Sequence, residues 1–238
     1  MSGAGVRIVI NVDRLFRWHL ICIGFFAAAY ILTVVCFDLF GFQRLRFLAR
    51  LFSLNAEQNP PALFSAGALL LTAAVCGLCA RLSEKKENYF WMLMAFVFAY
   101  LAIDEAIAIH ELLVPRARIF FHASGAFANA WVIPYGIALV IFLFFVCGPL
   151  MRLPVSTRNG LVLAGIVFVT GALGFEMIEA GVRNPAFMPW MTQSLMSSTF
   201  MLCEESLEML GIALALRTCL YHLTQRSGTV DVMLAITR

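Results

Sequence analysis

The chain has 238 residues, of which 62% are hydrophobic and 13% are charged, and its mean hydropathy is +0.88. Soluble domains average about 45–50% apolar and about 25% charged residues, so the composition excludes a disordered chain and a disulfide-rich secreted module. The formal net charge of +3 is too small and too dispersed for a surface that binds a nucleic-acid backbone. The composition predicts an all-α, polytopic membrane protein.

Six apolar stretches are each long enough to cross a bilayer, whose hydrocarbon core of about 30 Å needs about 20 helical residues. We expect helices, because a lipid-facing backbone must bond within its own segment and the stretches lack the alternation of barrel strands. The sequence predicts one integral membrane domain over residues 1–238, a six-transmembrane-helix bundle. Its spans are about 18–40, 62–82, 90–112, 131–151, 160–181 and 195–216, and aromatic residues such as Trp131 lie near their ends.

Six spans place both termini on one side of the membrane, together with eleven of the 17 Lys and Arg residues. The positive-inside rule therefore predicts cytoplasmic termini, with the loops around His122 and Arg183 facing outward. The basic and apolar segment at residues 44–52 opposes this bias on the outer side. It is either an interfacial helix or an amphipathic connector.

Eight of the fourteen acidic residues lie in the third, fifth and sixth spans: Asp104, Glu105, Glu111, Glu176, Glu179, Glu204, Glu205 and Glu208. A charge at the bilayer centre costs about 2.5–3.5 kcal/mol, so eight unpaired charges would cost on the order of 20 kcal/mol. That exceeds a typical folding stability of about 5–15 kcal/mol. The third and fifth spans contain no Lys or Arg, so we expect these acids to be protonated or metal-bound.

The three acidic clusters are predicted to lie at one depth, because each falls in the outer half of its span. At about 100° per helical residue, Glu204, Glu205 and Glu208 share one arc of about 100°. Asp104 and Glu111 differ by about 20° and should share a stripe, joined by either Glu105 or His110. Tyr100 precedes Asp104 by one helical turn and is expected within hydrogen-bonding reach of it.

A carboxylate-rich site with one imidazole suits a divalent iron, manganese or zinc ion, and calcium or magnesium if the imidazole stays outside. Glutamates that project from neighbouring helices build such sites in helical bundles. If Glu205 or Glu111 remains free of metal, it could serve as general acid or base. His122 is a second possible nitrogen ligand. The predicted metal ligands are Asp104, His110, Glu176, Glu179, Glu204 and Glu208.

The seven cysteines all lie in or at the ends of apolar stretches. Cys76 and Cys79 form a CxxC motif inside a span, where packing explains small residues better than a metal or redox role does. Cys203 adjoins the acidic cluster and is a possible outer-shell residue. Gly165, Gly171 and Gly174 in the fifth span should let a neighbouring helix approach closely.

The strings AIDEAIAIHE and EESLEMLG resemble a family of uncharacterised bacterial multi-pass membrane proteins. That family carries a DE-plus-HE motif on one helix and an EE-x-LE-x-x-G motif on its last helix. The resemblance covers about the third to the sixth span. It implies a bacterial inner-membrane location and supplies no activity.

Three functions from different classes are compatible with these residues. The first is a metalloprotein whose outward-facing site acts as an enzyme on an apolar or lipid substrate from the bilayer. The second is a proton- or metal-coupled transporter, against which stands the lack of acids in the inner halves of the spans. The third is an accessory membrane subunit without catalysis. The sequence itself leaves oligomeric state and partner proteins open.

Overall fold

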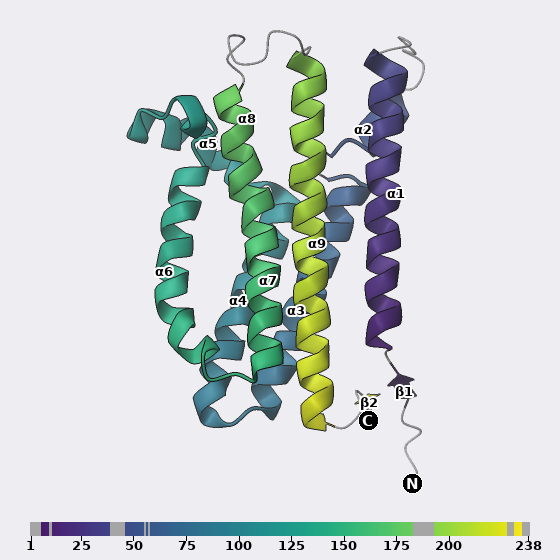
Figure 1. Ribbon diagram of the computed structural model, residues 1–238, viewed down its shortest axis with the longest axis vertical. Coiled ribbons are helices and arrows are strands. Elements are labelled where there is room, and N and C mark those ends of the chain that lie inside the picture. The colour runs from purple at the N-terminus through teal and green to yellow at the C-terminus, as the bar shows by residue number, and fades with distance from the viewer. Residues whose placement is uncertain are drawn as a thin grey trace.

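The computed structural model describes residues 6–9, 11–38, 46–54, 56, 58–182, 193–227 and 231–234. Long helices run side by side along the molecule (Figure 1). They are α1 (Val12–Asp38), α3 (Pro60–Leu82), α4 (Lys85–Ile107), α6 (Val132–Leu150), α7 (Val155–Val169) and α9 (Gln193–Ser227). The shorter elements are α2 (Arg46–Leu51), α5 (Ile109–Phe121), the 3-10 turn η2 (Gly125–Phe127), the π-helical turn η3 (Thr170–Phe175) and α8 (Glu176–Val182).

Among the described residues, five helices are long and apolar enough to cross a membrane, and one of them runs continuously through α7, η3 and α8. The helical fold and the multi-pass membrane class are therefore confirmed. The sixth predicted span lies within α9, whose 35 residues are more than the about 20 that a crossing needs. Because α9 also carries the glutamates of the acidic cluster, it falls outside that set of five, and six crossings remain a prediction.

Helix α9 occupies the middle of the bundle and packs against α1, α3 and α7 (Figure 1). Helices α3 and α4 form an antiparallel hairpin behind it, and α6 lies at the outer flank. The largest apolar core joins α3, α4 and α9 near the end of the bundle where the chain termini lie. Its fully buried members include Cys76, Phe90, Trp91 and Cys219.

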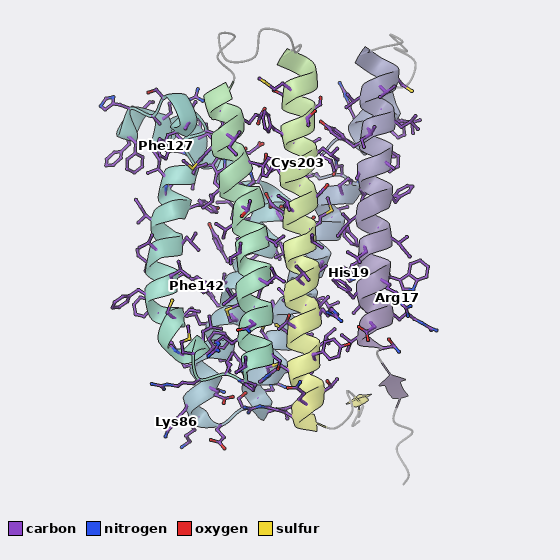
Figure 2. The ribbon with its side chains drawn as sticks, in the orientation of Figure 1. Arg17, His19, Lys86, Phe127, Phe142 and Cys203 are labelled. Carbon is purple, nitrogen blue, oxygen red and sulfur yellow. The ribbon has the colours of Figure 1, made fainter. Side chains whose placement is uncertain are left out.

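Both termini lie at the same end of the bundle. The strands β1 (Val6–Val9) and β2 (Asp231–Leu234) pair there in antiparallel fashion, a small sheet that the helix-only expectation omitted because it lies outside the apolar stretches. Arg17 and Lys86 lie toward this end, whereas Phe127 lies at the opposite end (Figure 2). At the terminal end Arg217 also pairs with Asp13 at 3.0 Å, which ties α9 to α1.

The third predicted span, residues 90–112, is wrong at its end, because the helix breaks at Ala108. Ala108 adopts the left-handed conformation with φ 54°, and its N–H donates to the carbonyl oxygen of Asp104. The chain then starts a new helix, α5, which carries His110 and Glu111. Asp104 and Glu111 therefore do not share a stripe of one helix. The Glu111 residue is exposed.

Two other predictions concern segments between the long helices. Helix α2 lies within the basic and apolar segment 44–52, and its Phe47 is exposed. Arg44 of that segment and the predicted outward loop around Arg183 lie outside the described residues.

Candidate metal centre

Three glutamates from two helices meet in the half of the bundle away from the termini. Glu176 and Glu179 belong to α8, and Glu204 belongs to α9. One carboxylate oxygen from each lies within 4.8 Å of the others. All three residues are buried, with exposed fractions of 9%, 3% and 6%. The predicted convergence of the fifth and sixth spans is thus present in the structure.

Local helix geometry sets the direction of these side chains. Glu176 and Glu179 are separated by three residues, so they share one face of α8. Directly before them, the π-helical turn η3 inserts one extra residue into the helix, which rotates α8 by about 100° relative to α7. Such π-turns are frequent at functional sites. Here the turn lies directly before the residues that face α9.

A glycine in η3 allows α9 to come close at the same level. A Cβ atom on Gly171 would lie 2.8 Å from the backbone oxygen of Glu204 and 3.1 Å from Cγ of Glu208. The prediction of a close helix approach is therefore correct for Gly171. It is wrong for Gly165, whose Cβ would meet nothing within 4 Å, and Gly174 has only ordinary contacts within α7 and η3.

The carboxylate cluster, formed by Glu176, Glu179 and Glu204, would be destabilised by mutual repulsion if all three groups were ionised. At an effective dielectric constant of about 20, two ionised carboxylates less than 5 Å apart repel by about 3 kcal/mol, so three pairs cost about 10 kcal/mol. This energy is comparable to the whole stability of a typical protein. The Oε2 atom of Glu204 is buried and has no hydrogen-bond partner in the described part of the chain. The arrangement therefore favours a bound cation or protonated carboxyl groups.

Trp131, at the start of α6, contacts the cluster directly. Its indole Nε1 donates a hydrogen bond of 3.1 Å to Oε1 of Glu176, and both residues are buried. This contact ties one oxygen of Glu176 to α6. The indole ring also packs against His110, with ring centroids 5.0 Å apart, and edge-on against Tyr135 at 5.1 Å.

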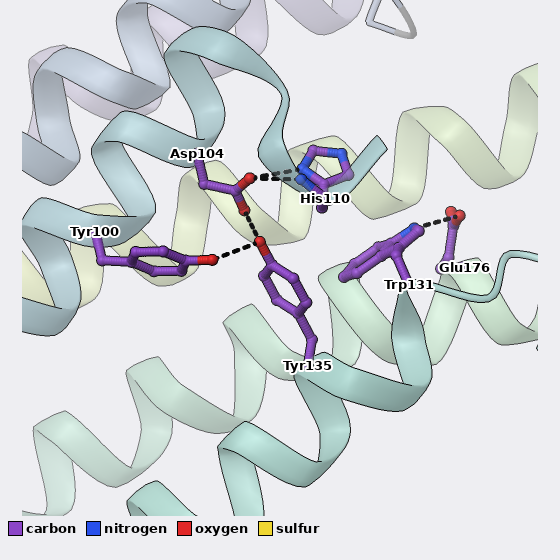
Figure 3. A network of polar contacts seen from close by, with 6 residues as sticks. All are labelled: Tyr100, Asp104, His110, Trp131, Tyr135 and Glu176. Carbon is purple, nitrogen blue, oxygen red and sulfur yellow. Dashed lines mark hydrogen bonds and ion pairs between the residues drawn. The ribbon is translucent and has the colours of Figure 1, made fainter. Parts of the chain in front are cut away.

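The carboxylate of Asp104 forms a second polar network beside the first (Figure 3). It accepts a 2.8 Å hydrogen bond from the backbone N–H of His110 and lies 3.2 Å from Nδ1 of the same residue. Its other oxygen accepts a 2.8 Å hydrogen bond from the hydroxyl of Tyr135. Since that proton points to Asp104, the hydroxyl of Tyr100, 2.9 Å away, donates to Tyr135. The predicted contact of Tyr100 with Asp104 thus runs through Tyr135.

The predicted ligands fall into two groups in the structure. Glu176, Glu179 and Glu204 form the cluster, while Asp104 and His110 form the neighbouring network, and Trp131 touches both. Glu208 lies one helical turn beyond Glu204 and packs against Gly171, outside the group of three. Whether any of these residues binds metal remains a prediction.

The remaining residues singled out from the sequence lie around the cluster rather than in it. Glu205 is half-buried next to Glu204 on α9, and Cys203 precedes both on that helix (Figure 2). His122 ends α5 in the left-handed conformation and is exposed, outside the group of three.

Comparison with known families places most of the chain in a family of unknown function. The model of a family described as "Domain of unknown function (DUF8692)" matches residues 20–223, which is most of the chain. The chain belongs to this family. No curated protein and no solved structure matches it. The membership agrees with the resemblance to an uncharacterised family and assigns no activity to the carboxylate cluster.

Sequence reasoning missed the aromatic residues of the site and the π-turn. Trp131 and Tyr135 are separated by four residues at the start of an apolar stretch, where an aromatic pair reads as a membrane-interface anchor. The sequence also contained a signal for a polar role, because Trp131 and Tyr135 lie in the half of the bundle that carries the acids. Buried Trp and Tyr usually find a hydrogen-bond partner, and here the partners are acids.

Proposed function

We propose that this protein is a membrane metalloprotein that holds a divalent cation between α8 and α9 through Glu176, Glu179 and Glu204. The observation that carries the proposal is the meeting of three buried carboxylates within 4.8 Å, with one oxygen of Glu204 lacking a hydrogen-bond partner in the described part of the chain. A cation would compensate the mutual repulsion of the carboxylates, and its binding energy would stabilise the fold.

The cluster offers oxygen ligands alone, because His110 lies in the neighbouring network. Oxygen ligands suit manganese, ferrous iron, magnesium and calcium, while an imidazole would add affinity for zinc. Among the iron, manganese and zinc ions expected from the sequence, Mn²⁺ and Fe²⁺ therefore fit the cluster best. Glu208, one helical turn beyond Glu204 on α9, is the further glutamate that the sequence predicts as a ligand and would complete the set.

A cation held in this way would activate water or dioxygen toward an apolar or lipid substrate that enters from the bilayer. Glu205, next to Glu204 and half-buried, is better placed than the exposed Glu111 to exchange protons with such a substrate. The enrichment of Lys and Arg on the terminal side supports cytoplasmic termini in a bacterial inner membrane, with the site in the outer half.

The packing of the bundle favours a metalloprotein over a transporter. Directly beyond the acids on α9, Met209, Ile212 and Leu216 are almost fully buried in apolar clusters. A proton or cation path across the membrane would need polar groups or water at this depth. An accessory subunit without catalysis would use the same cation for stability alone.

Metal analysis of the purified protein tests the proposal. Protein prepared without chelator should contain stoichiometric metal, and the isosteric variants Glu176→Gln and Glu204→Gln should lose most of it. Glu84→Gln, at an exposed carboxylate before α4, is the matched control and should keep it. Wild-type protein without metal, which also fails to bind added Mn²⁺, would contradict the proposal and favour protonated acids on a proton path.

A further inference from the structure

A second cluster of reactive side chains lies in the other half of the bundle, between α3 and α9. The Sγ atoms of Cys76 and Cys219 are 3.7 Å apart, although the residues are separated by 143 positions in the chain. Both residues are completely buried. The Sγ of Cys79 approaches the same point and lies 3.8 Å from the backbone oxygen of Cys219.

This thiol cluster is separate from the carboxylate cluster. Cys219 follows Glu204 by fifteen residues on α9, which is about 22 Å along the helix. It belongs to the apolar core with Phe90, Trp91 and Leu220, and the buried imidazole of His222 lies against Trp91 with ring centroids 4.7 Å apart. The sequence suggested the CxxC pair, Cys76 with Cys79, but the structure gives Cys76 a nearer partner on another helix.

The contact is close to the geometry of a disulfide. A disulfide has an S–S length of about 2.05 Å, so the two sulfur atoms need to approach by about 1.7 Å. A change of side-chain rotamer or a small movement of α3 against α9 can supply this distance. Packing alone explains a single buried cysteine, whereas two helices that each present a thiol to the other provide a bond-forming pair.

We propose that Cys76 and Cys219 are a reversible redox site, which a lipid-soluble two-electron acceptor of the quinone or azo class converts to a disulfide. Each thiol gives up its hydrogen, one S–S bond forms, and two electrons and two protons pass to the acceptor. A quinone becomes a hydroquinone, and an azo compound becomes a hydrazine. The apolar setting selects an oxidant that dissolves in the bilayer.

The disulfide would fasten α9 to α3 in the half of the bundle opposite the carboxylates. It would close a loop of more than half the chain and thereby restrict the unfolded state. The site does not depend on metal binding. Oxidation of the two thiols by an acceptor in the membrane would fix α9, which carries Glu204, against α3.

Diamide, a membrane-permeant azo compound, is the probe for this site. Full-length protein in membranes is treated with diamide, alkylated under denaturing conditions, digested with trypsin and examined by mass spectrometry. We expect peptide 51–81, which contains Cys76 and Cys79, joined to peptide 218–226, which contains Cys219. The joined mass should be lower than the sum by two hydrogen atoms, and dithiothreitol should separate the peptides.

Two variants identify the partner within peptide 51–81. Cys79→Ser should keep the link and Cys76→Ser should lose it. The opposite pattern would assign the bond to Cys79 and overturn the proposed pair. The proposal also fails if Cys219 of the wild type stays fully alkylated at diamide concentrations that oxidise glutathione added to the same sample.

Discussion

At the scale of single residues, Trp131 connects the two polar networks of this protein. Its indole N–H donates a hydrogen bond to one oxygen of Glu176. Its ring packs against His110, which is hydrogen-bonded to Asp104. Groups that orient a metal ligand from outside the coordination shell commonly contribute 10–100-fold to affinity. Trp131 has the position of such a group, because it fixes the rotation of the Glu176 carboxylate.

Trp131→Phe is therefore expected to weaken Mn²⁺ binding by about 10–100-fold while keeping an aromatic ring beside His110. Mn²⁺ binding can be followed by electron paramagnetic resonance of the free ion. The control is Trp91→Phe, which changes a fully buried tryptophan in the apolar core that also contains Cys219. Equal affinity in wild type and Trp131→Phe would show that the indole does not orient the ligand.

The residue scale also shows what the sequence could predict about the site. Glu176 and Glu204 could be brought together from span direction and depth, because a charge in an apolar helix must face inward. Trp131 and Tyr135 could be placed at the same depth as the acids, but they could not be paired with Glu176 and Asp104, which lie 45 and 31 residues away. Such pairs depend on how α4, α6 and α8 pack, which no local pattern contains.

At the scale of elements, the site depends on how closely η3 approaches α9. Alanine normally stabilises a helix relative to glycine by about 0.5–1 kcal/mol. At Gly171 the sign should reverse, because the new Cβ would lie 2.8 Å from the backbone oxygen of Glu204. The backbone cannot rotate away as a flexible side chain can, so the helices must separate.

Gly171→Ala is thus expected to destabilise the protein by about 1–3 kcal/mol, as overpacked cores do, and to weaken Mn²⁺ binding with it. Gly165→Ala on α7 is the matched control, since its Cβ would meet nothing within 4 Å. That control should leave the melting temperature unchanged or raise it. A Gly171→Ala protein as stable as Gly165→Ala would mean that the close contact is not needed.

The helix break at Ala108 is a feature that the sequence could not predict. The segment AIDEAIAIHE contains neither Gly nor Pro, and its apolar residues continue through the break. The break instead depends on the Asp104 side chain, which accepts the backbone N–H of His110 after the turn. Aspartate competes with helical backbone bonds in this way, but that becomes visible only when its partners are known.

At the scale of the whole molecule, hydropathy and length suffice to predict the helical bundle. An apolar stretch of about 20 residues can bury its backbone only as a helix in lipid, whatever its neighbours are. Hydropathy and length do not predict how the helices are arranged relative to one another. The central place of α9 follows from contacts with α1, α3, α7 and η3, in which Gly171 of η3 and Gly211 of α9 let the backbones approach.

The stability of the bundle should depend on the proposed cation. Without it the three carboxylates repel one another, and the bound cation would compensate that repulsion. A cation present at about 100 times its dissociation constant adds about 2.7 kcal/mol to the folded state. For a chain of this size that corresponds to roughly 5–10 °C in the melting temperature. Chelation with EDTA should lower the melting temperature of the wild type in detergent by this amount.

The variant Glu204→Gln separates a metal effect from a general loss of stability. It removes one of three like charges, so its melting temperature in EDTA should equal or exceed that of chelated wild type. It also removes a ligand, so added Mn²⁺ should no longer raise its melting temperature. Glu84→Gln should keep the wild-type response. If wild type melts at the same temperature with Mn²⁺ and with EDTA, the three glutamates are held together by shared protons rather than by a cation.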